Sequence, residues 1–159
     1  MIQKPRPEPA LAELGDFTVD SRTLWISLLA ILIGVLNCGV ALALLKLIAF
    51  FTNVFFFGAF DFVERSPAAH TLGIFVVAIP VIGALIIGVM ARYGSDRIRG
   101  HGIPEAIEAI LLNGSRVEPK LALLKPLSSA ISIGSGGPFG AEGPIIMTGG
   151  AFGSLTAQL

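Results

Sequence analysis

The chain has 159 residues, of which 53% are hydrophobic and 14% are charged, and its mean hydropathy is +0.81. Soluble domains carry roughly 25% charged residues, so this composition excludes an ordinary soluble globular protein. Eleven basic and eleven acidic residues cancel, which leaves no basic surface for nucleic acid. With one cysteine, Cys38, and two widely separated histidines, we expect neither a disulfide scaffold nor a metal site.

The N-terminal residues 1–21 are polar and contain three prolines, Pro5, Pro7 and Pro9. They predict a tail outside the membrane. The apolar stretch that follows is too long for the hydrophobic core of a signal peptide, so we do not expect the tail to be removed. Residues 22–159 are then predicted to form one transmembrane domain.

Two long apolar runs predict membrane spans. Residues 24–50 contain a single charge, Lys46, and at about 1.5 Å per residue they exceed the roughly 30 Å hydrocarbon core, so we expect a tilted helix. The aromatic and charged residues of 52–70 predict an interfacial turn, with the helix ending near Gly58. Residues 72–91 carry no charge and predict the second span.

Three shorter apolar segments follow, at residues 103–112, 121–133 and 144–159. Each is too short to cross a membrane fully, so we predict partial helices. Glycine is unusually frequent, with 19 residues, and it is concentrated between Gly134 and Gly153. This concentration indicates a region where a ligand or another segment must come close to the backbone.

Basic residues predict the orientation. Lys4, Arg6 and Arg22 precede the first span. Six more follow the second span: Arg92, Arg97, Arg99, Arg116, Lys120 and Lys125. The positive-inside rule places both groups in the cytosol, so we expect an integral, multi-pass membrane protein with a cytosolic N-terminus.

Two segments share one design, in which a glycine-rich loop is followed by a proline and a predicted helix. They are GHGIPEAIEAI from Gly100 and GSGGPFGAEGPIIMTGG from Gly134. The start of a helix presents unpaired N–H groups and a partial charge of about +0.5, which suits an anion. Short, interrupted apolar segments are also typical of transport sites.

Glu142 is the only charged side chain between Pro126 and Leu159. An ionised group inside a membrane costs at least roughly 2.5 to 3.5 kcal/mol, so its presence indicates function. The alternative is a capping carboxylate on the helix predicted to start at Pro144. Both interpretations can hold, because a carboxylate on those N–H groups would compete with an anion and would leave when protonated.

The sequences GHGIPEA at 100–106, GSGG at 134–137 and GAEGP at 140–144 resemble, in this order and spacing, the CLC family of voltage-gated chloride channels and chloride/proton antiporters. The resemblance implies an all-α integral membrane protein, the first part of a CLC-type inverted-repeat helical bundle with short broken helices. It implies chloride transport, as a channel or as an exchanger, and no enzyme activity. It further implies a homodimer in the lipid bilayer, chloride and protons as transported ions, and no cofactor.

The resemblance also implies roles for individual residues. Glu142 takes the place of the gating glutamate, which accepts protons. The cytosolic anion-binding residues would be Gly100, His101, Gly102, Ile103 and Pro104. The outer anion-binding residues, acting through backbone amides, would be Phe139, Gly140, Ala141, Gly143, Pro144 and Ile145.

Three positions depart from the family pattern. His101 stands where a serine is common, and its ring can donate to an anion or turn toward the aqueous vestibule, so anion selectivity stays open. Ala141 stands where a basic residue is frequent, which removes a charge that would attract anions. Pro138 replaces a small polar residue and stiffens the loop.

Two other interpretations differ in kind. A CLC subunit is more than twice this length, so we expect a fragment, and the alternative function is a transport-inactive membrane fragment or scaffold that needs the missing C-terminal portion. An enzyme or nucleotide-binding module would use Gly134, Gly136 and Gly140 as a phosphate loop. This spacing matches neither common phosphate-loop motif, and the flanking segments are membrane-like.

Overall fold

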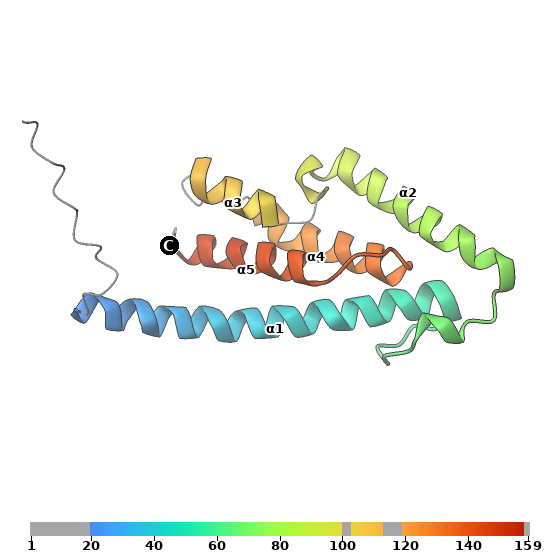
Figure 1. Ribbon diagram of the computed structural model, residues 1–159, viewed down its shortest axis with the longest axis horizontal. Helices are drawn as coiled ribbons and strands as arrows, with labels where there is room; N and C mark the ends of the chain where they lie inside the picture. The colour runs from blue at the N-terminus through green and yellow to red at the C-terminus, as the bar shows by residue number, and fades with distance from the viewer. Residues whose placement is uncertain (1–19, 100–102, 113–118, 158–159) are drawn as a thin grey trace, which may run out of the picture. The chain divides into compact units, whose positions relative to one another are not determined.

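The computed structural model describes residues 20–99, 103–112 and 119–157 (Figure 1). The chain divides into two compact units, Met1–Leu32 and Ile33–Leu159. The first unit contributes the opening turns of helix α1, and the second holds every other element. All regular elements in the described residues are helices, which confirms the predicted all-α class.

Helix α1 spans Ser21–Phe57 and is longer than the predicted span. It begins beside Asp20, whose Oδ1 accepts a hydrogen bond from the Thr23 N–H at 3.0 Å. Residues 52–57 were predicted as part of an interfacial turn, but they continue the helix. The helix ends where the turn was expected, because Gly58 adopts a φ of 62°, a left-handed conformation that favours glycine.

The segment after Gly58 folds back on the end of α1. Asn53 is fully buried, and its Nδ2 donates to the carbonyl oxygens of Asp61 at 3.1 Å and Val63 at 2.7 Å. The same amide contacts the Asp61 carboxylate, which also pairs with Arg65 at 2.8 Å. A short 3₁₀ helix, η2 (Pro67–Ala69), follows in this connection.

The second predicted span consists of the 3₁₀ helix η3 (Gly73–Val77) and helix α2 (Ala78–Tyr93). Pro80 explains the change of helix type. A proline ring clashes with the carbonyl group four residues earlier in an α-helix, so the turn before it adopts the tighter form. Pro80 itself lies in the first turn of α2, where its missing N–H costs little.

Three shorter helices follow: α3 (Ile103–Leu112), α4 (Pro119–Gly134) and α5 (Glu142–Ala157). A 3₁₀ turn, η4 (Asp96–Ile98), precedes α3. Helix α5 begins two residues earlier than the sequence predicts, because Pro144 is accommodated in its first turn. Helix α4 packs against both α2 and α5, and α3 packs against α5 (Figure 1).

The helices meet through apolar contacts and close glycine contacts. The buried apolar cluster contains Ala91, Ile98, Leu121 and Met147. Helices α2 and α4 approach closely at Gly83, where an added Cβ would lie 2.1 Å from Ser135 Oγ and 2.6 Å from Ser135 Cβ. Helix α5 approaches α1 at Gly149, where an added Cβ would lie 3.1 Å from Asn37 Nδ2.

Two helical segments of the described chain, Ser21–Phe57 and Gly73–Tyr93, are long and apolar enough to cross a membrane. Only 6% of the apolar window of the first and 17% of that of the second is buried inside the protein. A core helix of a soluble protein would be mostly buried. These apolar surfaces therefore need another apolar environment, which a bilayer provides.

Candidate functional site

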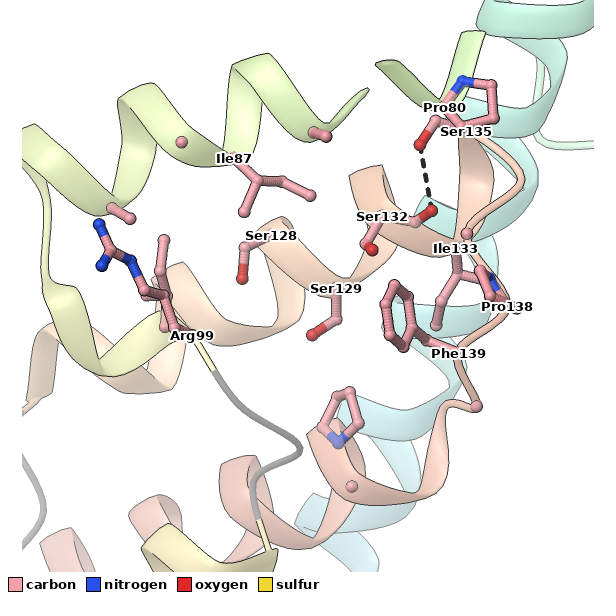
Figure 2. Close-up of a pocket in the computed structure, with 18 of the residues that line it drawn as sticks. Pro80, Ile87, Arg99, Ser128, Ser129, Ser132, Ile133, Ser135, Pro138 and Phe139 are labelled. Atoms are coloured by element: carbon pink, nitrogen blue, oxygen red, sulfur yellow. Dashed lines mark hydrogen bonds between the residues drawn. The ribbon is translucent and has the colours of Figure 1, made fainter. Parts of the chain in front are cut away.

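A cavity of about 790 Å³ lies between α2, α4 and the start of α5 (Figure 2). Ile87 of α2, the serines of α4, and Phe139 in the loop before α5 surround the same space in Figure 2, and Arg99 lies at one end. The first residue of α3, Ile103, also lines it. The cavity therefore joins elements from both glycine-proline segments.

The loop before α5 makes few hydrogen bonds of its own. Gly136 has a φ of 87°, and the N–H of Gly137 donates to Ser132 O at 2.9 Å. The first helical bond of α5 runs from the Ile145 N–H to Ala141 O at 3.1 Å. Within the described residues, the N–H groups of residues 140–143 make no hydrogen bond. Four consecutive donors are thus left at the positive end of a helix.

Glu142 is the first residue of α5, and it lines the cavity. Its side chain is exposed, and among the described residues it makes no hydrogen bond or ion pair. The sequence also allowed the Glu142 carboxylate to cap a helix that starts at Pro144. In the structure the helix already starts at Glu142, and the carboxylate accepts no hydrogen bond from a described residue. Glu142 and the four N–H donors thus lie at the same helix start, and Glu142 lines the cavity there.

The structure brings together part of the predicted site. Six of the predicted residues line the cavity: Ile103, Phe139, Gly140, Glu142, Gly143 and Pro144. Pro104, Ala141 and Ile145 are placed in or beside the same helix starts but are not cavity-lining residues. Gly100, His101 and Gly102 lie outside the described residues, so their predicted role stays a prediction.

Sequence reasoning missed four serines that line the cavity: Ser128, Ser129 and Ser132 of α4, and Ser135 directly after it. Ser128 Oγ donates to Lys125 O at 3.0 Å, and Ser135 Oγ donates to Ser132 O at 3.1 Å (Figure 2). The hydroxyls of Ser129 and Ser132 make no hydrogen bond with any described residue. The helical spacing of these serines in an apolar segment was the available signal.

Two of the basic residues that follow the second span have contrasting surroundings. Lys125 is buried, with its side chain 1% exposed. Arg99 lines the cavity and pairs with Asp96 at 3.4 Å, with both side chains largely exposed. The orientation that these residues predict stays a prediction.

No group of three or more histidine, cysteine, aspartate or glutamate side chains capable of holding a metal ion occurs in the part of the chain that the structure describes. The polar side chains that line the cavity are serine hydroxyls, one guanidinium and one carboxylate. Apart from the carboxylate they can all donate hydrogen bonds, which suits an anion better than a cation.

Comparison with known proteins agrees with this chemistry. The family model described as voltage gated chloride channel matches residues 82–159. A ClcB-like chloride channel protein of Ralstonia nicotianae is 30% identical over 81 residues, which cover 51% of this chain and 19% of that relative. The match thus spans about a fifth of the relative's length. No solved structure gave a significant match.

The matched segment begins within α2 and includes α3, α4, α5 and both glycine-proline segments. It also contains nearly all of the cavity lining. Together with the two apolar helices, the match identifies the chain as a membrane protein. Residues 82–159 of this chain, just under half of its length, match the voltage gated chloride channel family.

Proposed function

We propose that this chain contributes part of a pathway for chloride across a membrane, as a channel or as a chloride/proton exchanger. The observation that carries the proposal is the cavity at the start of α5, where four consecutive N–H groups lack partners in the described chain. The family match and the name of the relative, a chloride channel protein, indicate chloride as the transported ion.

The anion would lie at the first turn of α5. Backbone N–H groups of residues 140–143 and the dipole of α5 would replace part of its hydration shell. The hydroxyls of Ser129 and Ser132, which line the same cavity, would donate from α4. The donors are neutral, so they can hold an anion without trapping it as tightly as a buried cation would.

Glu142 would gate this position. Its ionised carboxylate carries the same charge as chloride and belongs to the same first turn of α5, so the two would compete for the same donors. Protonation neutralises the carboxylate and removes the competition. Anion flux should therefore rise as the pH falls.

The architecture that accompanies this function is also proposed. The two apolar helices would cross the bilayer with the N-terminus in the cytosol, and the described helices would form the first part of an inverted-repeat bundle. The active protein would be a homodimer. The two apolar helices and the basic residues that flank them in the sequence support the first statement, and the family match supports the others.

The test is chloride efflux from liposomes that contain the full 159-residue chain, with gluconate as the impermeant control anion. Efflux that exceeds protein-free liposomes and rises at low pH supports the proposal. Efflux that appears only when the C-terminal portion of a relative is reconstituted with the chain supports the alternative of an inactive piece that needs the rest. No efflux in either case favours a membrane scaffold.

His101 offers a second test. Replacing His101 with serine puts a hydroxyl where the sequence has an imidazole, and we expect relative permeability to shift toward chloride over nitrate and fluoride. The measurement is the ratio of anion fluxes in both proteins. Identical ratios would mean that the ring does not contact the anion.

A further inference from the structure

The largest fully buried side chain in the described residues is that of Lys125, on α4. Burying an ammonium group costs several kcal/mol unless hydrogen bonds satisfy it. Contact with water at the surface therefore does not explain the presence of this lysine. Its contacts indicate what does.

Lys125 Nζ donates to Ile98 O at 3.0 Å and to Arg99 O at 3.4 Å. Ile98 is the last residue of η4 and Arg99 follows it, and both residues line the cavity. The next residues along the chain are Gly100–Pro104, the first glycine-proline segment. One side chain of α4 thus fixes the backbone that leads into this segment.

The same residue is tied to the serine face of α4. Ser128 Oγ donates to Lys125 O at 3.0 Å, and Ser128 itself is 3% exposed and lines the cavity. Two walls of the cavity, the η4 end and the α4 serines, therefore meet at Lys125. A displacement of its ammonium group would move the Ile98–Arg99 wall relative to the α4 serines.

We propose that Lys125 is a positioning residue for anion binding. It sets the distance between the Ile98–Arg99 wall and the α4 serines. The inference rests on the proposed function, because it concerns how well the cavity binds chloride. It assigns the effect to hydrogen bonds that hold backbone, and it requires no direct contact between Lys125 and the ion.

The test uses three variants of the full chain in detergent, with chloride affinity measured by calorimetry and folding measured by thermal unfolding. Lys125→Met keeps the length of the side chain and removes the donors. Lys125→Gln keeps donors without the charge. Lys120→Met is the matched control, since Lys120 is an exposed lysine on the same helix.

We expect Lys125→Met to bind chloride about tenfold more weakly than the unmodified chain, the scale of losing a hydrogen bond to a charged group. Lys125→Gln should recover most of that loss, and Lys120→Met should match the unmodified chain. A merely structural role would lower the unfolding temperature and leave the affinity of the folded protein unchanged.

Chloride affinity equal to that of the unmodified chain in folded Lys125→Met overturns the inference while the proposed function stands. If Lys125→Met does not fold, Lys125→Gln decides. A chloride affinity of Lys125→Gln as low as that of a variant with alanine at both Ser129 and Ser132 would overturn the inference, because hydrogen-bond donors at position 125 would then not position the wall. No chloride binding by the unmodified chain overturns the proposed function itself.

Discussion

Helix α1 and the α4–α5 pair differ in which side chains they expose and which they bury. From Leu24 to Leu45 the large apolar residues of α1 are mostly exposed, and its buried residues lie toward the C-terminal end. The α4–α5 pair is shorter, and it buries lysine, serine and threonine side chains. One region presents apolar surface outward, and the other keeps polar groups inside.

The difference indicates where each region obtains its stability. Helix α1 satisfies its backbone internally, so it needs only an apolar solvent around its side chains. The α4–α5 pair gains its stability from specific contacts: close glycine packing, hydroxyl hydrogen bonds and the Lys125 anchor. Substitutions should therefore be tolerated on α1 and costly in the pair. The following variants test that contrast, from the largest expected effect to the smallest.

Glu142→Gln should have the largest effect. The amide mimics the protonated carboxylate, so flux should become high and should no longer depend on pH, while the unmodified chain is slower when the carboxylate is ionised. Chloride efflux at several pH values measures this. Retained pH dependence in the variant would remove Glu142 from the gating role.

Gly134→Ala should destabilise the fold. An added Cβ would lie 2.6 Å from Phe51 Cβ and 3.0 Å from Thr52 N, so backbone has to move. We expect a loss of about 1 to 3 kcal/mol in the free energy of unfolding, measured in detergent. Gly150→Ala on α5, where nothing lies within 4 Å, is the control and should stay near zero.

Thr148→Val should stabilise the fold modestly. Thr148 is 1% exposed, and its Oγ1 has no hydrogen-bond partner among the described residues. Valine has nearly the same shape and removes the unsatisfied hydroxyl, which should add about 1 kcal/mol to the free energy of unfolding. A clear loss of stability would mean that the Thr148 hydroxyl makes a hydrogen bond in the membrane-embedded protein.

Gly39→Ala should change least. Nothing lies within 4 Å of the added Cβ, and alanine favours helix over glycine by about 0.8 to 1.0 kcal/mol in a helix interior. We expect unchanged or slightly higher stability in thermal unfolding. Marked destabilisation would show that this face of α1 packs against protein, and the contrast with the α4–α5 pair would fail.

Much of the fold was predictable from local patterns. The apolar runs locate the long helices, Gly58 marks the end of α1, and Ile103 and Pro104 mark the start of α3. Helix boundaries near prolines were less accurate, because a first-turn proline fits on either side of a boundary. The interfacial turn was placed too early, since consecutive phenylalanines are as compatible with a helix as with a membrane interface.

The candidate site was predictable only where its residues are adjacent in the sequence. The loop at 139–144 is one segment, so its glycines and Glu142 could be identified together. The serines of α4 and the burial of Lys125 depend on how α4 meets α2 and η4, which are distant in sequence. A lysine beside a polar loop has the sequence pattern of a surface charge, and only tertiary contacts distinguish the two.

The close contact of Gly83 with Ser135 has a consequence for how this sequence can vary. A larger residue at Gly83 would collide with both the Oγ and the Cβ of Ser135, whereas the next atom, Ile131 O, lies at 3.8 Å. Alanine at Gly83 should therefore be tolerated when Ser135 becomes glycine and harmful when it does not. The two positions are expected to change together in related sequences, as a coupled pair in which one site's volume limits the other's.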